Sequence, residues 1–548
     1  MKNINTGLNN NLQPKDKQIS PNFSDLENPE TIKNNLKELT ENKDKATPHR
    51  EVMEELRKQF EPLDFQLMAF PQVEKLREQL QDLELKLTNP DGSHNTDKAL
   101  DRERMERKDV RKELARLKIN AKHLLVLSVE NVLNVAAENR WGLCKNHDFI
   151  YLYNGTYWDD IDKEAFRKFL GESAEKMGVA KFSARYFLFR EQLFKQFLGT
   201  AYLPTPEQKN NKVLINLQNG TFEISQEGTN LRPFDRDDFI TYQLPFSYEP
   251  KAKAPVFESY LDRVLPDKER QRVLAEYLGY VFIKHGSNTL KEEKALILYG
   301  TGANGKSVFF EIVNSLLGEN NVSTFSLQSL TNDNGYFRAK MANKLVNYAS
   351  EINGKLESSI FKQLVSGEPV EARLPYGQPF QLKQYAKLIF NCNELPKDVE
   401  HTNAYFRRFL IIPFDETIPE NEQDKNLHTK IIDNELAGVF NWMLEGLNRL
   451  LNQRRFSYCG AAEKALEAYK TESNSVQMFI NENGYQKESE KYTLIKNLYS
   501  EYRNFCLEDG VTPFKKSNFI KQLRALGYVV DRVTDNKLAA FVKNPNEF

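Results

Sequence analysis

Residues 300–307 read Gly-Thr-Gly-Ala-Asn-Gly-Lys-Ser, and they follow the apolar run Ala295-Leu296-Ile297-Leu298-Tyr299. This order predicts a buried strand, a glycine-rich loop and a helix that starts near Val308. Glycines let backbone N–H groups approach phosphate oxygens where a Cβ would block them, and the helix N-terminus favours negative charge. The stretch is therefore a candidate phosphate-binding loop made of Gly300, Thr301, Gly302, Ala303, Asn304, Gly305, Lys306 and Ser307.

The last two residues of this loop predict the cofactors. Lys306 can reach the β- and γ-phosphates of a nucleoside triphosphate, and the Ser307 hydroxyl can bind Mg²⁺. The alternative is an ordinary glycine-rich surface turn, which the preceding apolar strand disfavours. We therefore expect ATP and Mg²⁺ as cofactors.

Two further apolar runs end in polar side chains. The run Leu345–Ser350 leads to Glu351, and the run Lys387–Cys392 leads to Asn393. A carboxylate beside the γ-phosphate can orient and deprotonate the attacking water, and an amide can hold the same water or sense the phosphate. Glu351 is thus the expected catalytic base and Asn393 the expected sensor.

An arginine pair, Arg407 and Arg408, lies beyond the strand that leads to Asn393. An arginine so far along the chain is expected to reach the nucleotide of a neighbouring subunit and to act there as a finger in trans. Two adjacent arginines are also a common surface feature, and the sequence does not distinguish which of them would be the finger.

Residues 369–383 predict a β-hairpin between the strands of Glu351 and Asn393, with its tip at 375–378. In an ATPase ring such a hairpin would point into the central pore. Tyr376 could then stack on a base, and Arg373 and Lys383 could contact phosphates of single-stranded DNA. The alternative is an ordinary hairpin of the core.

The remaining chain predicts a multidomain α/β protein. Residues 1–48 are polar and predict a disordered tail, and 49–124 predict a charged helical hairpin broken at Asn89–Gly92. That hairpin is either a plain helical domain or an arm for oligomerisation or a partner. Residues 125–250 contain two predicted hairpins with Asn-Gly turns and two amphipathic helices, which indicates a mixed α/β domain before an ATPase domain at 251–452.

The tail, 461–548, predicts three helices followed by a β-hairpin. This is the pattern of a winged helix, whose third helix enters the DNA major groove. The residues expected to project outward from that helix are Lys516, Asn518, Lys521, Gln522 and Arg524. A solvated polar helix face of the same composition is the alternative.

Bulk composition narrows the class of protein. The net charge is −1, which neither supports nor excludes nucleic acid, because a ring can keep its basic groups inside a channel. The four cysteines are scattered, and Cys144 with His147 is more simply a buried thiol beside a surface histidine than a metal site. The polar N-terminus and the absence of a long apolar run predict a cytoplasmic protein without a membrane span.

Together these motifs resemble superfamily 3 helicases of the phage, plasmid and poxvirus primase-helicase type. The resemblance rests on 300–307, the lone Glu351, Ser366-Gly367-Glu368, the stretch Phe390–Pro396 and the Arg-Arg-Phe-Leu-Ile-Ile-Pro-Phe run that ends at Phe414. It covers roughly residues 125–548. The size and layout are similar to the replication initiator helicases of staphylococcal pathogenicity islands, which are phage satellites.

The resemblance implies a hexameric AAA+ ring that moves 3′→5′ on single-stranded DNA and initiates replication at a double-stranded origin in a bacterial host cell. Lys306 and Ser307 would bind ATP and Mg²⁺, Glu351 would activate water, Asn393 would be the sensor, and Arg407 or Arg408 the finger. Host replication proteins are further candidate partners.

Two departures from the family pattern stand out. Ser350 occupies a position that is acidic in many relatives, so Mg²⁺ would rely on Ser307, Glu351, waters and phosphates. Residues 1–125 carry no convincing aspartate pair or zinc motif, so primase activity is not expected. Two other functions remain open: an ATP-regulated origin-binding protein that does not unwind DNA, and an AAA+ remodeller of protein partners.

Overall fold

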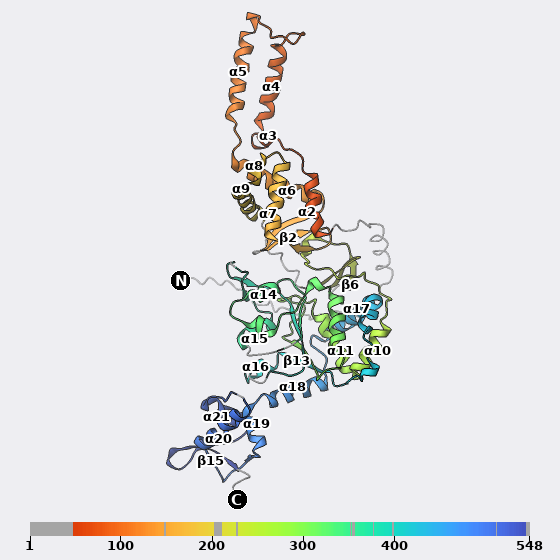
Figure 1. The fold of residues 1–548 in the computed structure, drawn as a ribbon, viewed down its shortest axis with the longest axis vertical. Helices are drawn as coiled ribbons and strands as arrows, with labels where there is room; N and C mark the ends of the chain where they lie inside the picture. Colours follow the sequence, from red (N-terminus) through yellow and green to blue (C-terminus); the bar gives the residue numbers. More distant parts are fainter. Residues whose placement is uncertain are drawn as a thin grey trace, which may run out of the picture.

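The chain folds as a multidomain α/β protein, as the sequence predicted at that level. In the computed structural model an N-terminal helical arm lies at one end, a mixed region lies in the middle and a small C-terminal unit lies at the other end (Figure 1). The structure describes residues 48–146, 149–201, 211–225, 228–350, 352, 357–375, 377–396, 399–510 and 512–543. The tail expected to be disordered, 1–48, falls outside these residues except for Pro48.

The N-terminal unit is built from six helices around a three-stranded antiparallel sheet of order β1-β2-β3. Its apolar core draws on Val52 and Leu56 from the first helix and on Phe166 and Phe197 from two later ones. The turn after β2 is the expected Asn154-Gly155 turn, in which Gly155 has a φ of 100°. The elements are α2 (His49–Gln59), α3 (Phe65–Ala69), α6 (Ala121–Glu138), β1 (Gly142–Asn146), β2 (Phe149–Tyr153), β3 (Trp158–Asp160), α7 (Lys163–Lys176), α8 (Lys181–Arg185) and α9 (Phe187–Thr200).

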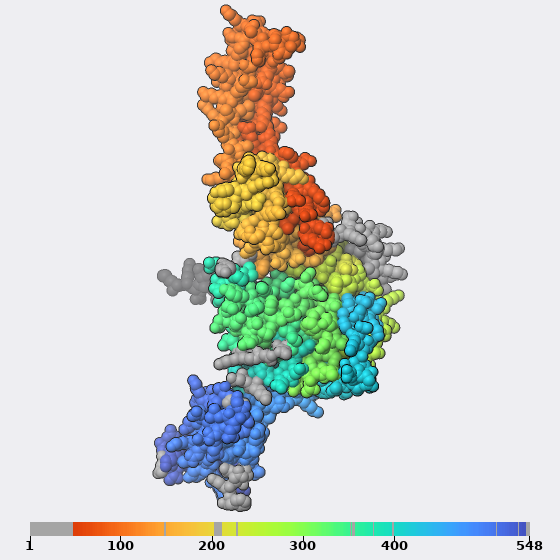
Figure 2. Space-filling model, in the orientation of Figure 1, coloured from red at the N-terminus to blue at the C-terminus, as the bar shows by residue number. Residues whose placement is uncertain are grey.

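The helical arm is an antiparallel pair, α4 (Gln72–Lys86) and α5 (Asp101–Arg116), and it projects from this unit as a narrow extension (Figure 2). A small core of Leu76, Leu83 and Val110 joins the two helices. The expected break near Asn89–Gly92 is present, and Gly92 has a φ of 81°. The second helix ends earlier than the sequence pattern indicated, because Asn120 caps a new helix, α6, with its side chain. The expected boundary between 124 and 125 therefore lies inside α6.

A second antiparallel sheet, of order β4-β5-β6, packs against the middle of the molecule. Its strands β4 (Val213–Leu217), β5 (Gly220–Ser225) and β6 (Gly228–Arg232) share one core with the helices α10 (Pro255–Val264), α11 (Lys268–Tyr280) and α17 (Leu427–Gln453). The ring of Phe222 in β5, for example, lies 6.5 Å from that of Phe440 in α17. The stretch 125–250, expected as one domain, thus contributes to two different cores, since burial of this sheet depends on helices far along the chain.

The central sheet has five parallel strands in the order β13-β7-β12-β9-β8. Along β7, Leu296 and Leu298 belong to one core, whereas Ala295 and Ile297 belong to the other. Because successive side chains of a strand point to opposite faces, the sheet is covered on both sides. The strands are β7 (Ala295–Tyr299), β8 (Val322–Ser323), β9 (Val346–Ala349), β12 (Lys387–Cys392) and β13 (Phe409–Pro413).

Short elements connect these strands. The predicted hairpin is present as an antiparallel pair of strands, with Val370 opposite Leu382. The connecting elements are α12 (Lys306–Leu317), α13 (Leu327–Thr331), α14 (Tyr336–Lys340), α15 (Ser358–Ser366), β10 (Val370–Ala372), β11 (Phe380–Leu382) and α16 (Asn403–Phe406), with single 3₁₀ turns at Lys98–Leu100, Arg236–Asp238, Glu319–Asn321, Glu420–Glu422 and Thr534–Asn536.

The C-terminal unit has its own core, which includes Phe479, Tyr502 and Phe519. The helix before it, α18 (Gly460–Glu472), packs instead on the central sheet, where Tyr469 Oη donates a hydrogen bond to the Pro396 carbonyl at 3.0 Å. The unit therefore starts after α18 rather than at 461. Its elements are α19 (Ser475–Glu482), β14 (Gln486–Lys487), β15 (Thr493–Leu494), α20 (Ile495–Glu508), α21 (Lys516–Ala525), β16 (Val530–Arg532), β17 (Leu538–Ala540) and β18 (Val542–Lys543).

Among the described residues, none of the helices combines the length and the apolar character needed to span a bilayer.

Candidate nucleotide site

Three segments named by the sequence meet at one edge of the central sheet. The phosphate loop follows β7, Ser350 follows β9, and Asn393 follows β12, which lies between the other two strands. Because the strands are parallel, their carboxyl ends share this edge. The Gly300 N–H donates a hydrogen bond to the Cys392 carbonyl at 3.1 Å, so the loop starts directly beside the end of β12.

The phosphate loop adopts a conformation that its glycines make possible. Gly302 and Gly305 have φ values of 118° and 84°, and Ala303 is also in the left-handed region at 48°. A Cβ on Gly300 would lie 2.3 Å from Asn304 Nδ2 and 2.4 Å from the Phe414 carbonyl oxygen. Nothing lies within 4 Å of the place where a Cβ on Gly302 would be, so the loop is open there.

Three contacts from outside the motif hold the loop. Tyr260 Oη donates to the Gly305 carbonyl at 2.8 Å, and Asn304 Nδ2 donates to the Phe414 carbonyl at 3.0 Å. The N–H of Ile418 donates to the Ala303 carbonyl at 2.8 Å. Sequence reasoning missed Tyr260 and Ile418, because neither belongs to a motif and only the folded chain brings α10 and the segment after β13 to the loop.

Lys306 begins α12 and is buried. Its ammonium donates to the Gly300 carbonyl at 2.7 Å and to Asn304 Oδ1 at 2.9 Å, and burial lowers its pKa. The neighbouring Ser307, like Thr301 and Ala303, is exposed. The residues present fit a triphosphate and Mg²⁺: an open left-handed loop, a lysine folded over it and an exposed hydroxyl at the first turn of a helix.

The catalytic carboxylate expected at Glu351 lies outside the described residues. The residues on either side are described: Ser350 is exposed at the end of β9, and Ile352 is buried. A buried side-chain hydrogen bond joins β9 to the neighbouring strand β12, because Tyr348 Oη donates to Asn391 Oδ1 at 2.9 Å. Asn393 is exposed just after β12, on the same edge as the loop.

The arginine pair lies at the opposite edge of the sheet. The Arg408 carbonyl accepts a hydrogen bond from the N–H of Ala295, the first residue of β7, at 2.7 Å. Arg408 is 7% exposed and donates to Ser366 Oγ at 2.7 Å, whereas the side chain of Arg407 is 59% exposed and pairs with Glu293 at 3.0 Å. The two arginines, equivalent in the sequence, therefore have different environments.

The hairpin residues have mixed environments. Arg373 is partly buried, and its guanidinium donates to Tyr336 Oη at 3.1 Å and lies 5.2 Å from the centre of the same ring. Lys383 is exposed just after β11. Tyr376, expected to stack on a base, lies outside the described residues.

The third helix of the C-terminal unit, α21, presents the expected polar face. Lys516, Asn518, Lys521 and Arg524 are exposed, while Phe519 and Leu523 are buried. Gln522 differs from the expectation: it is partly buried and accepts a hydrogen bond from Asn474 Nδ2 at 3.3 Å. Arg524 Nη2 donates to the Val530 carbonyl at 3.0 Å, so this side chain also braces the β-hairpin.

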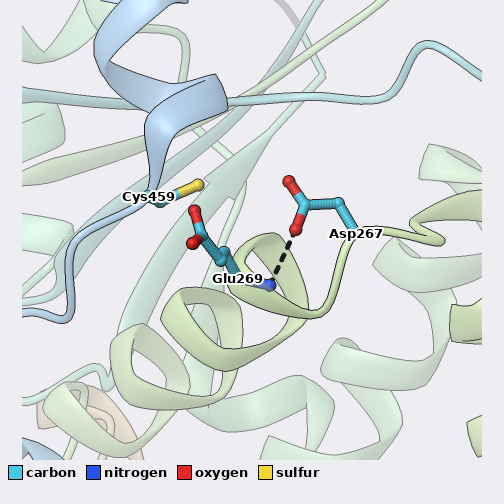
Figure 3. A group of neighbouring side chains, drawn as sticks. All are labelled: Asp267, Glu269 and Cys459. Atoms are coloured by element: carbon cyan, nitrogen blue, oxygen red, sulfur yellow. Dashed lines mark hydrogen bonds between the residues drawn. The ribbon is translucent and has the colours of Figure 1, made fainter.

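One cluster of possible metal ligands is found among the described residues, formed by Asp267, Glu269 and Cys459 (Figure 3). Its carboxylates already have partners: Asp267 accepts from the N–H of Glu269 at 2.9 Å, and Glu269 accepts from the N–H of Gly460 at 3.0 Å. Burial raises the pKa of the Cys459 thiol, which keeps it protonated. The cluster therefore links the starts of α11 and α18. Burial likewise raises the pKa of Cys144 to about 12, and His147 lies outside the described residues.

Comparison with known proteins supports a relationship to viral helicases and primases. Residues 134–266 match the family described as D5 N terminal like, and 298–408 match a family of unknown function, DUF5906. The chain is 26% identical over 240 residues to putative helicase L207/L206 of Acanthamoeba polyphaga mimivirus, covering 41% of this chain and 24% of that protein. It is 25% identical over 341 residues to putative helicase 184R of Invertebrate iridescent virus 6, covering 54% and 34%.

A third relative is putative primase C962R of African swine fever virus, which is 24% identical over 354 residues, with 58% of this chain and 35% of that protein covered. The chain therefore spans between a quarter and about a third of the length of these three relatives. Among solved structures, the C-terminal region of NrS-1 aligns with 75% of this chain and 98% of that chain, at 13% identity and a TM-score of 0.42. The chain is thus similar over part of its length to a D5 N terminal like domain and to segments of viral proteins named as putative helicases and primases.

Proposed function

We propose that this chain is an ATP-dependent DNA helicase and replication initiator. In this proposal it is a superfamily 3 AAA+ ATPase that loads at an origin, closes into a hexameric ring and moves 3′→5′ on single-stranded DNA. The observation that carries the proposal is the position of Arg407, which lies exposed at the sheet edge opposite the phosphate loop.

Arg407 cannot serve the loop of its own subunit. Arg407 lies before β13, and the phosphate loop follows β7, which pairs in parallel with β13. The length of β7, five residues from Ala295 to Tyr299, therefore separates Arg407 from the loop. At about 3.3 Å per residue this separation is about 16 Å along the strands. A head-to-tail neighbour would bring its own Arg407 to the loop, and head-to-tail contacts close into a ring when the rotation permits.

Of the two arginines, Arg407 is the better candidate for the finger. Arg408 is buried among Ser366, the Ala404 carbonyl and Glu293, so it could leave only by exposing a cavity. Arg407 is held by one exposed ion pair with Glu293, and such a pair contributes at most about 1 kcal/mol. A triphosphate on the neighbouring subunit could therefore replace Glu293 as its partner.

The remaining assignments follow from the resemblance and from residue positions. Counted along the chain, the central sheet has the strand order 5-1-4-3-2, which supports the AAA+ core. Lys306 would bind the β- and γ-phosphates, Ser307 and Glu351 would hold Mg²⁺, Glu351 would activate water and Asn393 would sense the γ-phosphate. Arg373, Tyr376 and Lys383 of the hairpin would contact single-stranded DNA in the pore. The three helices and the β15-β17-β16 sheet support a winged helix that binds the double-stranded origin.

A subunit-mixing experiment tests the central step. The Lys306→Ala chain lacks a functional loop and the Arg407→Ala chain lacks the finger, so each alone should lose hydrolysis and strand displacement on a forked duplex. In a 1:1 mixture, an intact loop meets an intact Arg407 at about a quarter of the interfaces, so ATPase activity should return to about a quarter of the wild-type rate. Arg454→Ala, a change of a surface arginine elsewhere, is the matched control and should keep full activity.

The outcomes separate the proposal from its alternatives. Lack of recovery in the mixture would show that Arg407 does not act in trans. Hydrolysis and origin binding by the wild type without strand displacement would favour an ATP-regulated origin-binding protein. Stimulation of the ATPase by a protein partner, with no response to single-stranded DNA, would favour a remodeller of proteins.

A further inference from the structure

A second cavity lies far from the phosphate loop, between the N-terminal unit and the central sheet. Its volume is about 190 Å³. It is lined by β2, by the segments 237–242 and 281–285, by 342–345 before β9, and by 380–387, which includes β11 and the start of β12. The start of β12 is the sheet edge opposite the phosphate loop, so the two sites are distinct.

Two nitrogen-bearing side chains of this cavity are buried without an acidic partner. Lys387 is 6% exposed, makes no ion pair with any described residue and lies with its ammonium 4.2 Å from the centre of the Tyr280 ring. Its Nζ is 3.1 Å from His285 Nδ1. The other ring nitrogen of His285, Nε2, is buried and has no hydrogen-bond partner among the described residues. A buried polar atom without a partner, such as His285 Nε2, and a buried ammonium without a counter-charge, such as that of Lys387, are both costly, and an anion would satisfy both.

Burial also depresses the basicity of these groups. It lowers the pKa of Lys387 to about 7, and together with the charge of Lys387 it lowers the pKa of His285 well below its usual range. Two acidic residues also line the cavity, and both have cationic partners: Asp238 pairs with Arg232 at 2.6 Å, and Asp237 lies 3.8 Å from Arg236. Lys284 and Lys383 add two more positive side chains to the lining. A bound anion would stabilise the charged form of Lys387 and so raise its pKa again, which is why the site favours an anionic ligand.

Four aromatic rings also line the cavity. The ring of Tyr151 lies 5.3 Å from that of Phe239, and the ring of Phe149 lies 6.2 Å from that of Phe380. These four rings come from the N-terminal unit, from the segment after β6 and from β11 of the hairpin. A planar aromatic ligand would gain stacking or edge contacts with them.

Two residues that line this cavity also have a strained backbone conformation. Among the described non-glycine residues, six have a positive φ, and one of them, Ala303, belongs to the phosphate loop. Two others, Phe239 at 45° and Asn343 at 59°, line this cavity. A left-handed phenylalanine is costly, and such strain persists mainly where a site requires it.

We propose that this cavity binds a free nucleoside monophosphate, with its phosphate at Lys387 and His285 and its base among the aromatic rings. The cavity opens to solvent, so a ligand can place its phosphate and base among the lining residues while its sugar extends toward the surface. Because the N-terminal unit and the hairpin both supply wall residues, occupancy would fix their relative positions.

Calorimetric titration of the full chain with AMP tests the proposal. The Lys306→Ala background is used because it disables the phosphate loop, which would otherwise bind the same compound. We expect one AMP per chain in this background. Lys387→Met should weaken AMP binding at least tenfold, and Phe380→Ala, a change on the partly exposed strand β11, should weaken it several-fold. Lys340→Met, on an exposed lysine outside the cavity, should leave it unchanged.

Further titrations identify the ligand class. Adenosine and inorganic phosphate should each bind at least tenfold more weakly than AMP, because each satisfies one wall only. AMP binding that is absent, or that survives both Lys387→Met and Phe380→Ala, would overturn the proposal. Displacement of AMP by a short oligothymidylate would assign the cavity to a nucleotide of the DNA strand and would overturn the assignment to a free ligand. The melting temperature of each variant verifies folding, and loss of binding in a folded Phe380→Ala chain supports the proposal even if Lys387→Met does not fold.

Discussion

Tyr260 Oη donates a hydrogen bond to the Gly305 carbonyl at 2.8 Å, so a helix outside the motif fixes the left-handed residue that ends the phosphate loop. Gly305 has no room for a side chain, since a Cβ there would lie 2.6 Å from Val264 Cγ1. The loop thus depends on α10 for its shape, and α10 in turn is held through the N–H of Phe257, which donates to Glu435 Oε2 of α17 at 2.9 Å.

Removing the Tyr260 hydroxyl should weaken nucleotide binding without unfolding the chain. Tyr260→Phe deletes a hydrogen bond worth about 1 kcal/mol and leaves the Gly305 carbonyl with the Phe309 N–H as its remaining donor. We expect ATP affinity to fall roughly fivefold, because part of the binding energy would then be spent on ordering the loop. Equilibrium titration with a fluorescent ATP analogue measures this. Tyr458→Phe, on an exposed tyrosine, is the control, and equal affinities for the two variants would contradict the argument.

Substitution of Arg408 should mainly lower thermal stability, whereas substitution of Arg407 should mainly abolish ATP hydrolysis. Arg408→Ala leaves a cavity in a buried site and removes the donors to Ser366 Oγ and the Ala404 carbonyl, which costs about 3 kcal/mol, so the melting temperature should fall by several degrees. Arg407→Ala removes only an exposed pair and should leave the melting temperature within about a degree of the wild type while hydrolysis is lost. Thermal unfolding and a steady-state ATPase assay on both variants test this. A stable but inactive Arg408→Ala chain, with Arg407→Ala active, would reverse the assignment.

The local pattern of residues predicted many of the helices, strands and turns. It did not predict the long-range contacts that assign each of them to a particular core. The strand and loop at 295–307, the turn at Asn154-Gly155 and the hairpin at 370–382 follow from apolar runs and turn residues that lie close together in the chain. The sheet of β4–β6 joins the central core through contacts such as that between Phe222 and Phe440, two residues more than two hundred positions apart in the chain. Nothing near Arg408 in the sequence indicates its burial, since that depends on Ser366 and Glu293.

The second cavity was equally invisible in the sequence. His285 and Lys387 are separated by about a hundred positions and carry no motif, and their proximity arises because the turn after α11 packs against the start of β12. The short strands β14 and β15 were missed because two-residue strands have no periodicity to read. A role could thus be predicted from the sequence for a residue that belongs to a motif. A site made of residues far apart in the sequence could be found only in the folded structure.

Buried Lys387 predicts a specific pH dependence of stability. Its folded pKa of about 7 lies below the ordinary value of 10.5, so between these values the unfolded chain binds a proton that the native chain has released. Stability therefore rises with pH in this window, by roughly 1 kcal/mol per pH unit from this group. His285 stays neutral there because its pKa is lowered, and Tyr280 and Tyr385 stay protonated because burial raises their pKa values.

Lys387→Met should remove that contribution. The variant should melt at a higher temperature than the wild type at pH 7. The difference should shrink at pH 9, because releasing the lysine proton on folding costs less as the pH approaches the ordinary pKa of 10.5. Melting curves of both chains at the two pH values, without nucleotide, measure the difference. Lys340→Met controls for the loss of a surface charge. A constant difference between wild type and Lys387→Met at the two pH values would contradict the depressed pKa.

Helix α21 should bind DNA through phosphate contacts that depend on salt. Lys516 and Lys521 are exposed on its polar face, and each lysine that contacts a phosphate releases condensed counterions on binding. Lys516→Ala and Lys521→Ala should each weaken binding to origin duplex and to unrelated duplex equally, and should each reduce the slope of log affinity against log salt by about 1. Arg524 is a poorer test, because its hydrogen bond to the Val530 carbonyl also supports the β-hairpin. Fluorescence anisotropy across a salt series, with Lys425→Ala as an exposed control before α17, gives the slopes. If Lys516→Ala and Lys521→Ala both retain the wild-type slope, as the control does, duplex binding belongs to another surface of the chain. The polar face of α21 would then be only a solvated face.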